Sequence, residues 1–174
     1  RNPYFHDATV RLFVCYGGDR PLSRLAIVLN QKHWHRFGVK TAFFGFFESF
    51  DDSDAAHELF ETAEVYCQRH GVEIIEGPFN PNHYSELGLQ SNKFGAPPAF
   101  FQSYNPAYYL QLLEENGFEI AKRVHTRKND RIGKYILQKH GSEPSFMSHG
   151  DYTVRSFRMN DFGAMLEKIR EVFN

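Results

Sequence analysis

A near-continuous run of apolar and aromatic residues at positions 41–50 constrains the fold of this chain more than any other feature. The run lacks the polar alternation that marks a strand with one face in water. Such a run predicts a central β-strand that is covered on both faces. The rest of the chain has to supply that cover, and 174 residues are enough for one domain with a sizeable core.

The residues after this run predict an α-helix and then a short strand. Asp51, Asp52, Ser53 and Asp54 are capping candidates, and acidic charge suits the N-terminal end of a helix dipole. The strand is expected at residues 72–75, after a glycine that ends the helix. The buried stripe of the helix is expected to consist of apolar residues at helical spacing, namely Ala56, Leu59, Phe60, Ala63 and Cys67.

The residues before the run predict an antiparallel hairpin. Residues 8–16 and 22–30 have strand-like composition, and a Gly-Gly-Asp turn joins them. Residues 31–39 are polar and rich in histidine, which predicts a loop. Within it, His33 and His35 lack a third ligand at a recognisable spacing, so a solvated loop is favoured over a metal site.

The residues after the strand at 72–75 predict one more helix and two final strands. Asn105 suits an N-cap with proline at the first helical position, and Gly117 suits the end of that helix. Residues 120–126 and 134–138 are expected to be strands. This order predicts an α/β fold (mixed α+β) with a central mixed, mostly antiparallel sheet flanked by helices.

The composition excludes several classes of protein. A formal net charge of −1 argues against a general nucleic-acid binder, and no apolar run approaches the roughly 18 residues that cross a bilayer. The two cysteines, Cys15 and Cys67, have no metal-ligand spacing and are too few for a disulfide framework. A cytoplasmic protein without bound metal is therefore expected.

Several motifs within residues 41–118 resemble the GNAT superfamily of N-acetyltransferases. The sequence LLEENGF at 112–118 resembles the Gly-Phe motif that ends a helix in that superfamily. Four segments are similar to bacterial N-acyltransferase-like proteins with tandem acetyltransferase-type units, some of which are linked to the acylation of long-chain amines. These segments are FGFFE at 44–48, GPFNPN at 77–82, ELG at 86–88 and YNPAYY at 104–109.

The resemblance implies a GNAT-like acyl-CoA N-acyltransferase fold and the corresponding reaction. An acyl group would pass from acyl-CoA or acetyl-CoA to an amine by direct attack in a ternary complex. Backbone groups of Phe46, Phe47 and Glu48, at the splayed end of the equivalent strand, would bind the cofactor. The acceptor would be a small-molecule or lipid-like amine, and the expected protein partners are a second copy or the remaining half of a larger chain.

The resemblance also implies a domain organisation. Residues 1–140 would form one GNAT-like domain that lacks its usual first strand and helices, and residues 141–151 would be a linker. Residues 152–174 would be a strand and a helix that either complete this domain, in a permuted or swapped arrangement, or begin a second unit. The first alternative is preferred because it covers the apolar face of that helix.

The chain departs from the superfamily at two positions that matter for activity. The glycine-rich pyrophosphate loop is replaced by FDDSD at 50–54, whose carboxylates repel phosphate. The usual tyrosine acid is replaced by Leu113, so a proton donor would have to come from Tyr104, Tyr108 or Tyr109. Both departures favour a rival interpretation, a non-catalytic half of a tandem protein that shapes a substrate pocket or binds a partner.

A polar loop at residues 80–86 is the leading candidate for chemistry. His83 suits a general base near neutral pH, and Glu86 does so if burial raises its pKa. The alternative is that the same polar groups form a hydrogen-bond scaffold for an irregular loop. The predicted site has Glu86, His83 and Tyr109 in catalytic roles and Asn80, Asn82, Tyr104 and Asn105 as substrate contacts.

Overall fold

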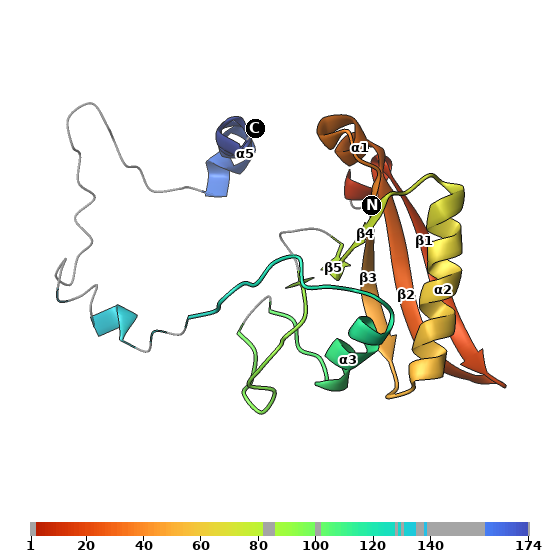
Figure 1. The fold of residues 1–174 in the computed structure, drawn as a ribbon. Helices are drawn as coiled ribbons and strands as arrows, with labels where there is room; N and C mark the ends of the chain where they lie inside the picture. Colours follow the sequence, from red (N-terminus) through yellow and green to blue (C-terminus); the bar gives the residue numbers. More distant parts are fainter. Residues whose placement is uncertain are drawn as a thin grey trace. The chain divides into compact units, whose positions relative to one another are not determined.

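The computed structural model describes residues 3–81, 86–99, 102–127, 129, 131–134, 138 and 159–173. The chain divides into two compact units, Arg1–Lys122 and Arg123–Asn174. The first unit contains the sheet and the longest helix that the structure describes, and the second contains the C-terminal helix (Figure 1).

The first unit is a mixed α/β structure built on a mostly antiparallel sheet. Its four strands are β1 (Ala8–Gly17), β2 (Arg20–Asn30), β3 (Thr41–Ser49) and β4 (Ile74–Glu76), in the spatial order β1-β2-β3-β4. The first two pairings are antiparallel, and β3 pairs with β4 in parallel. A small antiparallel ribbon of β5 (Phe79–Asn80) and β6 (Glu86–Leu87) follows. The hairpin predicted at the start of the chain is confirmed.

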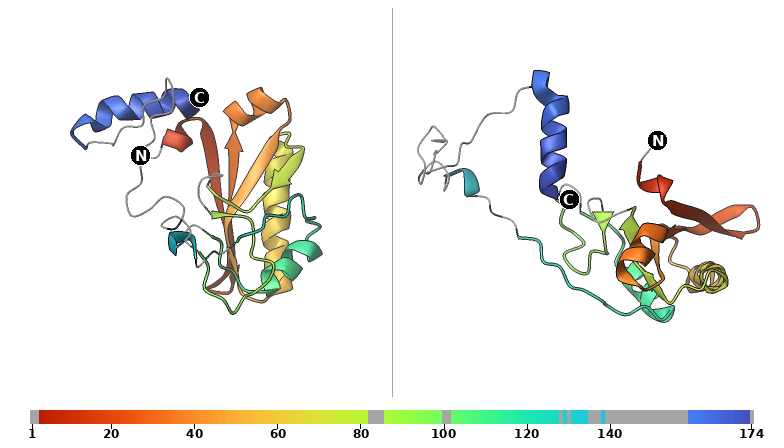
Figure 2. Two further views of the ribbon diagram at one scale, coloured as in Figure 1. Left: turned by 90° about the vertical axis from the view of Figure 1, so that its left-hand side faces the viewer. Right: turned by 90° about the horizontal axis from the view of Figure 1, so that it is seen from above.

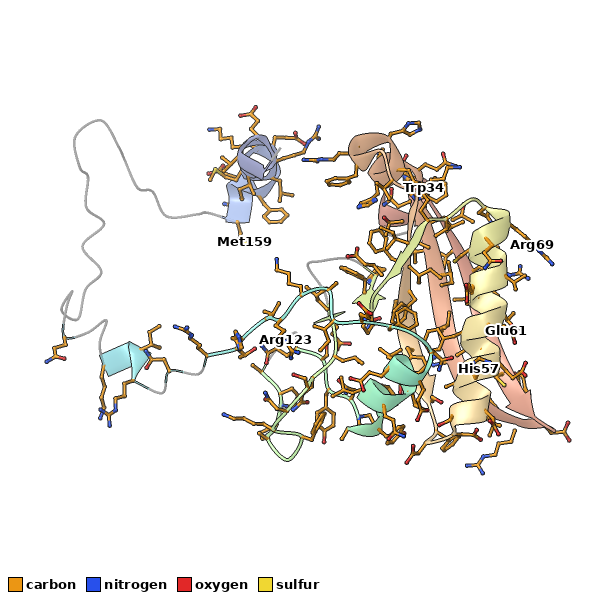
Figure 3. All side chains as sticks on the ribbon, in the orientation of Figure 1. Trp34, His57, Glu61, Arg69, Arg123 and Met159 are labelled. Carbon is orange, nitrogen blue, oxygen red and sulfur yellow. The ribbon has the colours of Figure 1, made fainter. Side chains whose placement is uncertain are left out.

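Helix α2 (Ser53–Arg69) joins β3 to β4 and lies along one face of the sheet (Figures 1 and 2). The side chain of Asp52 accepts a hydrogen bond from the Ala55 amide at 2.9 Å, which confirms the predicted capping of this helix. His57, Glu61 and Arg69 mark the exposed side of the helix (Figure 3). Its buried side chains are Ala55, Ala56, Leu59, Phe60, Ala63 and Cys67.

Strand β3 is covered on both faces, as its apolar run predicts. On the α2 face, the ring of Phe44 packs against those of Phe60 and Phe118, with centroids 5.6 and 5.0 Å away. Successive side chains of a strand point to opposite faces. Phe43 accordingly contacts a different set of rings, those of His33 and Phe79. The core therefore forms around this strand.

The predicted loop at 31–39 is wrong, because this segment contains helix α1 (Gln31–Phe37). The side chain of Asn30 caps the helix at the His33 amide, and Gly38 ends it in the left-handed conformation at φ 72°. The indole of Trp34 donates a hydrogen bond to the Thr41 carbonyl at 2.7 Å, which fixes the helix to the start of β3 (Figure 3).

Three further predictions downstream are wrong. Helix α3 (Tyr108–Glu115) begins later than predicted and has no side-chain N-cap, because the Asn105 side chain bonds the backbone of Gln90 instead. Residues 120–126 contain no strand. A strand requires a paired neighbour, and across the described residues nothing pairs with the outer edge of β4. Lys134, where the last strand was expected to begin, is helical.

The second unit contains a short 3₁₀ turn (Met159–Asp161) and helix α5 (Phe162–Phe173). This confirms the helix expected after residue 160. The strand expected before it lies outside the described residues, so the assignment of residues 152–174 stays a prediction. Within the parts of the chain that the structure describes, no helix combines the length and apolar character needed to span a bilayer.

Candidate functional site

Beyond Phe43, the side of β3 that faces away from β2 has no strand paired with it among the described residues. Strand β4 pairs with β3 only at Thr41, Ala42 and Phe43. Beyond that point, side chains supply hydrogen bonds to the backbone of β3. The Phe46 amide donates to Oδ1 of Asn80 at 2.6 Å, and the Ser49 amide donates to the Tyr109 hydroxyl at 3.0 Å. We call residues 44–49 of β3 the open edge.

A β-bulge interrupts the open edge at Phe46. Ala26 of β2 pairs with Gly45, and Arg24 pairs with Glu48, so β3 contains one residue more than β2 in this interval. Phe46 has φ 53°, in the left-handed region that a bulky residue rarely adopts. Strained backbone of this kind gathers at binding and active sites. The resemblance placed cofactor contacts at the same position.

The ribbon of β5 and β6 brings two predicted site residues to the bulge. Asn80 accepts the hydrogen bond from Phe46 through Oδ1 and donates another through Nδ2 to Oε2 of Glu86 at 3.2 Å. A Cβ atom on Gly45 would lie 1.9 Å from the Phe79 carbonyl oxygen, so only glycine allows β5 to approach this closely. Glu86 is exposed, and the burial on which its predicted role as a base depended is absent.

Tyr109 and Glu48 form a second polar pair on the open edge. The Tyr109 hydroxyl donates a hydrogen bond to Oε2 of Glu48 at 2.7 Å and accepts the one from the Ser49 amide. Burial and then the hydrogen bond to Glu48 raise the pKa of Tyr109. The phenol therefore stays protonated at neutral pH, and its proton lies toward Glu48. Sequence reasoning assigned Glu48 only a backbone role and missed its carboxylate.

Tyr108 lies next to this pair. Its hydroxyl donates a hydrogen bond to the Ser49 carbonyl at 2.9 Å, and its ring packs edge-on against that of Tyr109. Burial raises the pKa of Tyr108, and the carboxylates of Asp51 and Glu48 raise it further. Two tyrosines of α3 thus bond the backbone of Ser49, which β4 does not reach.

The remaining predicted site residues are not gathered at the open edge by the described contacts. The amide of Asn105 is buried, accepts from the Gln90 backbone amide at 2.7 Å and donates to the Pro106 carbonyl at 2.9 Å. It therefore supports a loop. Tyr104 is 68% exposed. Asn82 and His83 lie outside the described residues, and their roles stay predictions.

The acidic turn before α2 is used for structure. One Asp52 carboxylate oxygen is bound to the Ala55 amide, and the Ser53 hydroxyl donates to Oε2 of Glu115 at 2.7 Å. An amide of the first helical turn, where phosphate would bind, is thus bonded by the chain's own carboxylate. Among the described residues, no group of three or more histidine, cysteine, aspartate or glutamate side chains is placed to hold a metal ion.

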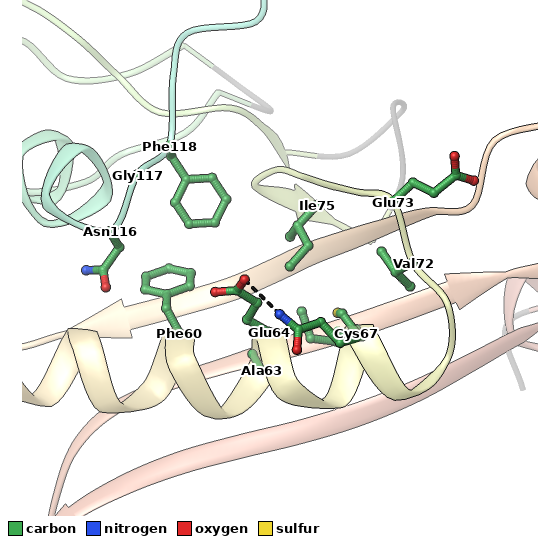
Figure 4. Close-up of a pocket in the computed structure, with 12 residues that line it drawn as sticks. Phe60, Ala63, Glu64, Cys67, Val72, Glu73, Ile75, Asn116, Gly117 and Phe118 are labelled. Atoms are coloured by element: carbon green, nitrogen blue, oxygen red, sulfur yellow. Dashed lines mark hydrogen bonds between the residues drawn. The ribbon is translucent and has the colours of Figure 1, made fainter.

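A cleft of about 450 Å³ lies between the C-terminal half of α2, β4 and the end of α3 (Figure 4). Its walls are the aromatic rings of Phe60 and Phe118 and the aliphatic side chains around Ile75. Its polar lining includes Glu64 and Gln68, which bond each other at 3.1 Å. The cleft contains none of the predicted site residues.

The thiol that lines this cleft is buried beside a carboxylate. Cys67 is 2% exposed, and burial followed by the charge of Glu64 raises its pKa to about 11. Since the thiolate is the nucleophile, Cys67 is not a candidate for covalent catalysis.

We expect iodoacetamide at mildly alkaline pH to alkylate the half-buried Cys15 and to spare Cys67, as read by peptide mass mapping. Alkylation of both thiols at equal rates in the folded protein would contradict this assignment, whereas in denaturing guanidinium chloride both should react.

Comparison with known proteins provides one relative. The chain is 30% identical over 133 residues to a protein named bacterial ceramide synthase from Caulobacter vibrioides (strain NA1000 / CB15N). The alignment covers 76% of this chain but 35% of the relative, so the chain spans about a third of that protein's length. No protein-family model matches the chain. No solved structure matches it either. The chain is therefore similar, over most of its length, to part of a protein with an acyltransferase-type name.

Proposed function

We propose that this chain is an acyl-CoA-dependent N-acyltransferase domain with a GNAT-type fold, and that the open edge of β3 receives the thioester. The observation that carries the proposal is the bulge at Phe46, where β4 no longer pairs with β3, with two carboxylates and a protonated phenol beside it. The acyltransferase-type name of the relative supports the same class of reaction.

The open edge suits the carbonyl group of a thioester. Acyl transfer needs hydrogen-bond donors for the oxygen on which negative charge develops. The Phe46 amide at the bulge is such a donor, and in this structure Asn80 accepts its hydrogen bond. A thioester carbonyl would take that bond in place of the side chain of Asn80. Asn80 thus keeps the amide satisfied until the substrate arrives, and the backbone groups of Phe46, Phe47 and Glu48 retain their proposed contact with the donor.

The acceptor in this proposal is a long-chain primary amine. A ceramide is the fatty amide of a long-chain amino alcohol, and the relative carries the name of an enzyme that makes one. Direct attack of the amine on the thioester is proposed because the described residues offer no activated nucleophile. Cys67 is protonated, and the hydroxyl of Ser49 donates to the Phe50 carbonyl at 2.8 Å.

A titration tests the proposed donor. We expect palmitoyl-CoA to bind the purified protein with a dissociation constant in the micromolar range, as measured by calorimetry, and to yield an amide when sphinganine is added. Asn80→Ala leaves the Phe46 amide unpaired and should alter donor affinity. The matched control is Asn116→Ala at the C-terminal end of α3, where the side chain bonds the Leu112 carbonyl. No binding of palmitoyl-CoA or acetyl-CoA at millimolar concentration would reject the proposal.

The second candidate is a non-catalytic half of a tandem protein. Three aspartates precede or begin α2, and Asp52 already occupies an amide of its first turn. Phosphate groups would meet like charge there. In this alternative the open edge shapes a pocket while another unit holds the donor. Amine binding without acyl-CoA binding is the result that would favour it.

A further inference from the structure

Glu48 differs from the other carboxylates of this unit because a buried phenol holds it at the bulge. It lies two residues beyond Phe46, and Oε2 accepts the hydroxyl of Tyr109 at 2.7 Å. The Tyr109 ring is 4% exposed and packs against Phe47 at a centroid distance of 4.9 Å. Its hydroxyl also accepts the Ser49 amide, so its proton points to Glu48.

The second oxygen of this carboxylate remains open to a ligand. Glu48 is exposed although its partner is buried. Among the described residues, the structure gives no hydrogen bond to Oε1 of Glu48. One oxygen is therefore anchored by the protein, and the side chain as a whole is exposed beside the bulge. The hydrogen bond from Tyr109 thus holds the carboxylate of Glu48 in one position and leaves its second oxygen available to a ligand.

We propose that Glu48 binds the ammonium group of the acceptor and takes its proton, and that Tyr109 is the positioning residue that aims this carboxylate at the thioester. The inference rests on the proposed function, because it requires a thioester carbonyl at the open edge. It changes the roles predicted from the sequence. Tyr109 acts through Glu48 rather than as a direct acid, and Glu48 acts through its side chain.

In the proposed reaction, Glu48 first accepts a proton from the amine and later returns it to the leaving thiolate. The ammonium group gives one proton to Glu48, and the freed nitrogen lone pair attacks the carbonyl carbon of the thioester to form the C–N bond. The C–S bond then breaks, and the sulfur leaves with the bonding electron pair. The nitrogen gives its second proton to water, and the thiolate takes the first from Glu48. The products are the amide, free CoA and one proton, and the carboxylate is regenerated.

The competing carboxylate at the bulge is Glu86. It is also exposed, but Oε2 is bonded to the side-chain amide of Asn80, whereas Glu48 is bonded to the hydroxyl of the buried Tyr109. An Asn80 side chain that moves to admit a carbonyl group would release Glu86. Glu48 keeps its anchor in the same event, because Tyr109 bonds the other end of the open edge. Glu48 is therefore the better placed of the two.

Glu48→Gln and Tyr109→Phe test the assignment with palmitoyl-CoA and sphinganine as probes. Glu48→Gln should lower kcat/KM for the amine by about 100-fold, within the range of a lost general base, and leave the dissociation constant of palmitoyl-CoA unchanged. Tyr109→Phe should lower kcat/KM for the amine by about tenfold. The ring stays in place and only the hydroxyl that aims Glu48 is lost, so the loss should fall on kcat and leave the KM for the amine unchanged. The control is Glu114→Gln, an exposed glutamate of α3.

A second measurement separates this inference from the proposed function. Sphinganine binding, measured by calorimetry without acyl-CoA, should weaken about tenfold in Glu48→Gln and stay unchanged in Glu114→Gln. Equal affinity in the wild type and Glu48→Gln, or turnover of Glu48→Gln within twofold of the wild type, overturns the role of Glu48. Failure of the wild type to bind any acyl-CoA rejects the proposed function, while the amine-binding result still decides whether Glu48 recognises the ammonium group.

Discussion

Gly45→Ala should lower the free energy of unfolding by about 3 kcal/mol, near the upper end for an overpacked site. The added Cβ would lie 1.9 Å from the Phe79 carbonyl oxygen and 2.9 Å from Oδ1 of Asn80. The nearer atom is backbone, so no rotamer change relieves the clash, and β5 has to move away from β3. Guanidinium denaturation followed by circular dichroism measures the loss.

The same substitution tests whether the bulge and β5 form one unit. Displacement of β5 carries Asn80 away from the Phe46 amide, so acyl-CoA binding should change together with stability. Gly95→Ala is the matched control, because nothing lies within 4 Å of a Cβ at that position. It should alter the free energy of unfolding by less than about 0.5 kcal/mol. Equal stability of the two variants would show that β5 does not pack against Gly45 in solution.

The central part of the fold was predictable because its signals are local. The apolar run of β3 requires two-sided cover, and α2 follows with an acidic cap and a stripe of small and apolar residues. Each of these signals lies within one element, and the structure confirms them. The turn at Gly18, with φ 63°, joins β1 and β2 in the same predictable way.

Helix α1 shows where local reasoning failed. Its residues are polar or aromatic without an apolar repeat, and none of them is buried. A signal was nevertheless present in the capping residues, since Asn30 and Gly38 bracket the segment as N-cap and left-handed C-cap residues do. The helix is held by one tryptophan and by the contact of His33 with Phe43, which no sequence periodicity reveals.

The candidate site could be predicted only in part, because its contacts join distant positions. Tyr109 and Glu48 are 61 residues apart, and Asn80 and Phe46 are 34 apart. The sequence motifs identified these residues separately, but only folding shows which ones pair. Asn105 illustrates the converse, because a polar residue selected as a substrate contact is used to hold the backbone of Gln90. Residue type indicates chemistry, and the fold decides what that chemistry serves.

Phe44→Ala should cause the largest loss of stability, about 4 kcal/mol. The side chain is 0% exposed and contacts the rings of Phe60 and Phe118, so truncation removes buried apolar area and leaves a cavity between β3 and α2. Phe37→Ala, at a ring that is 60% exposed, is the matched control and should cost about 1 kcal/mol or less. Guanidinium denaturation of both variants measures the difference. Equal losses would mean that β3 is not the centre of the core, and the two-sided cover of this strand would then be wrong.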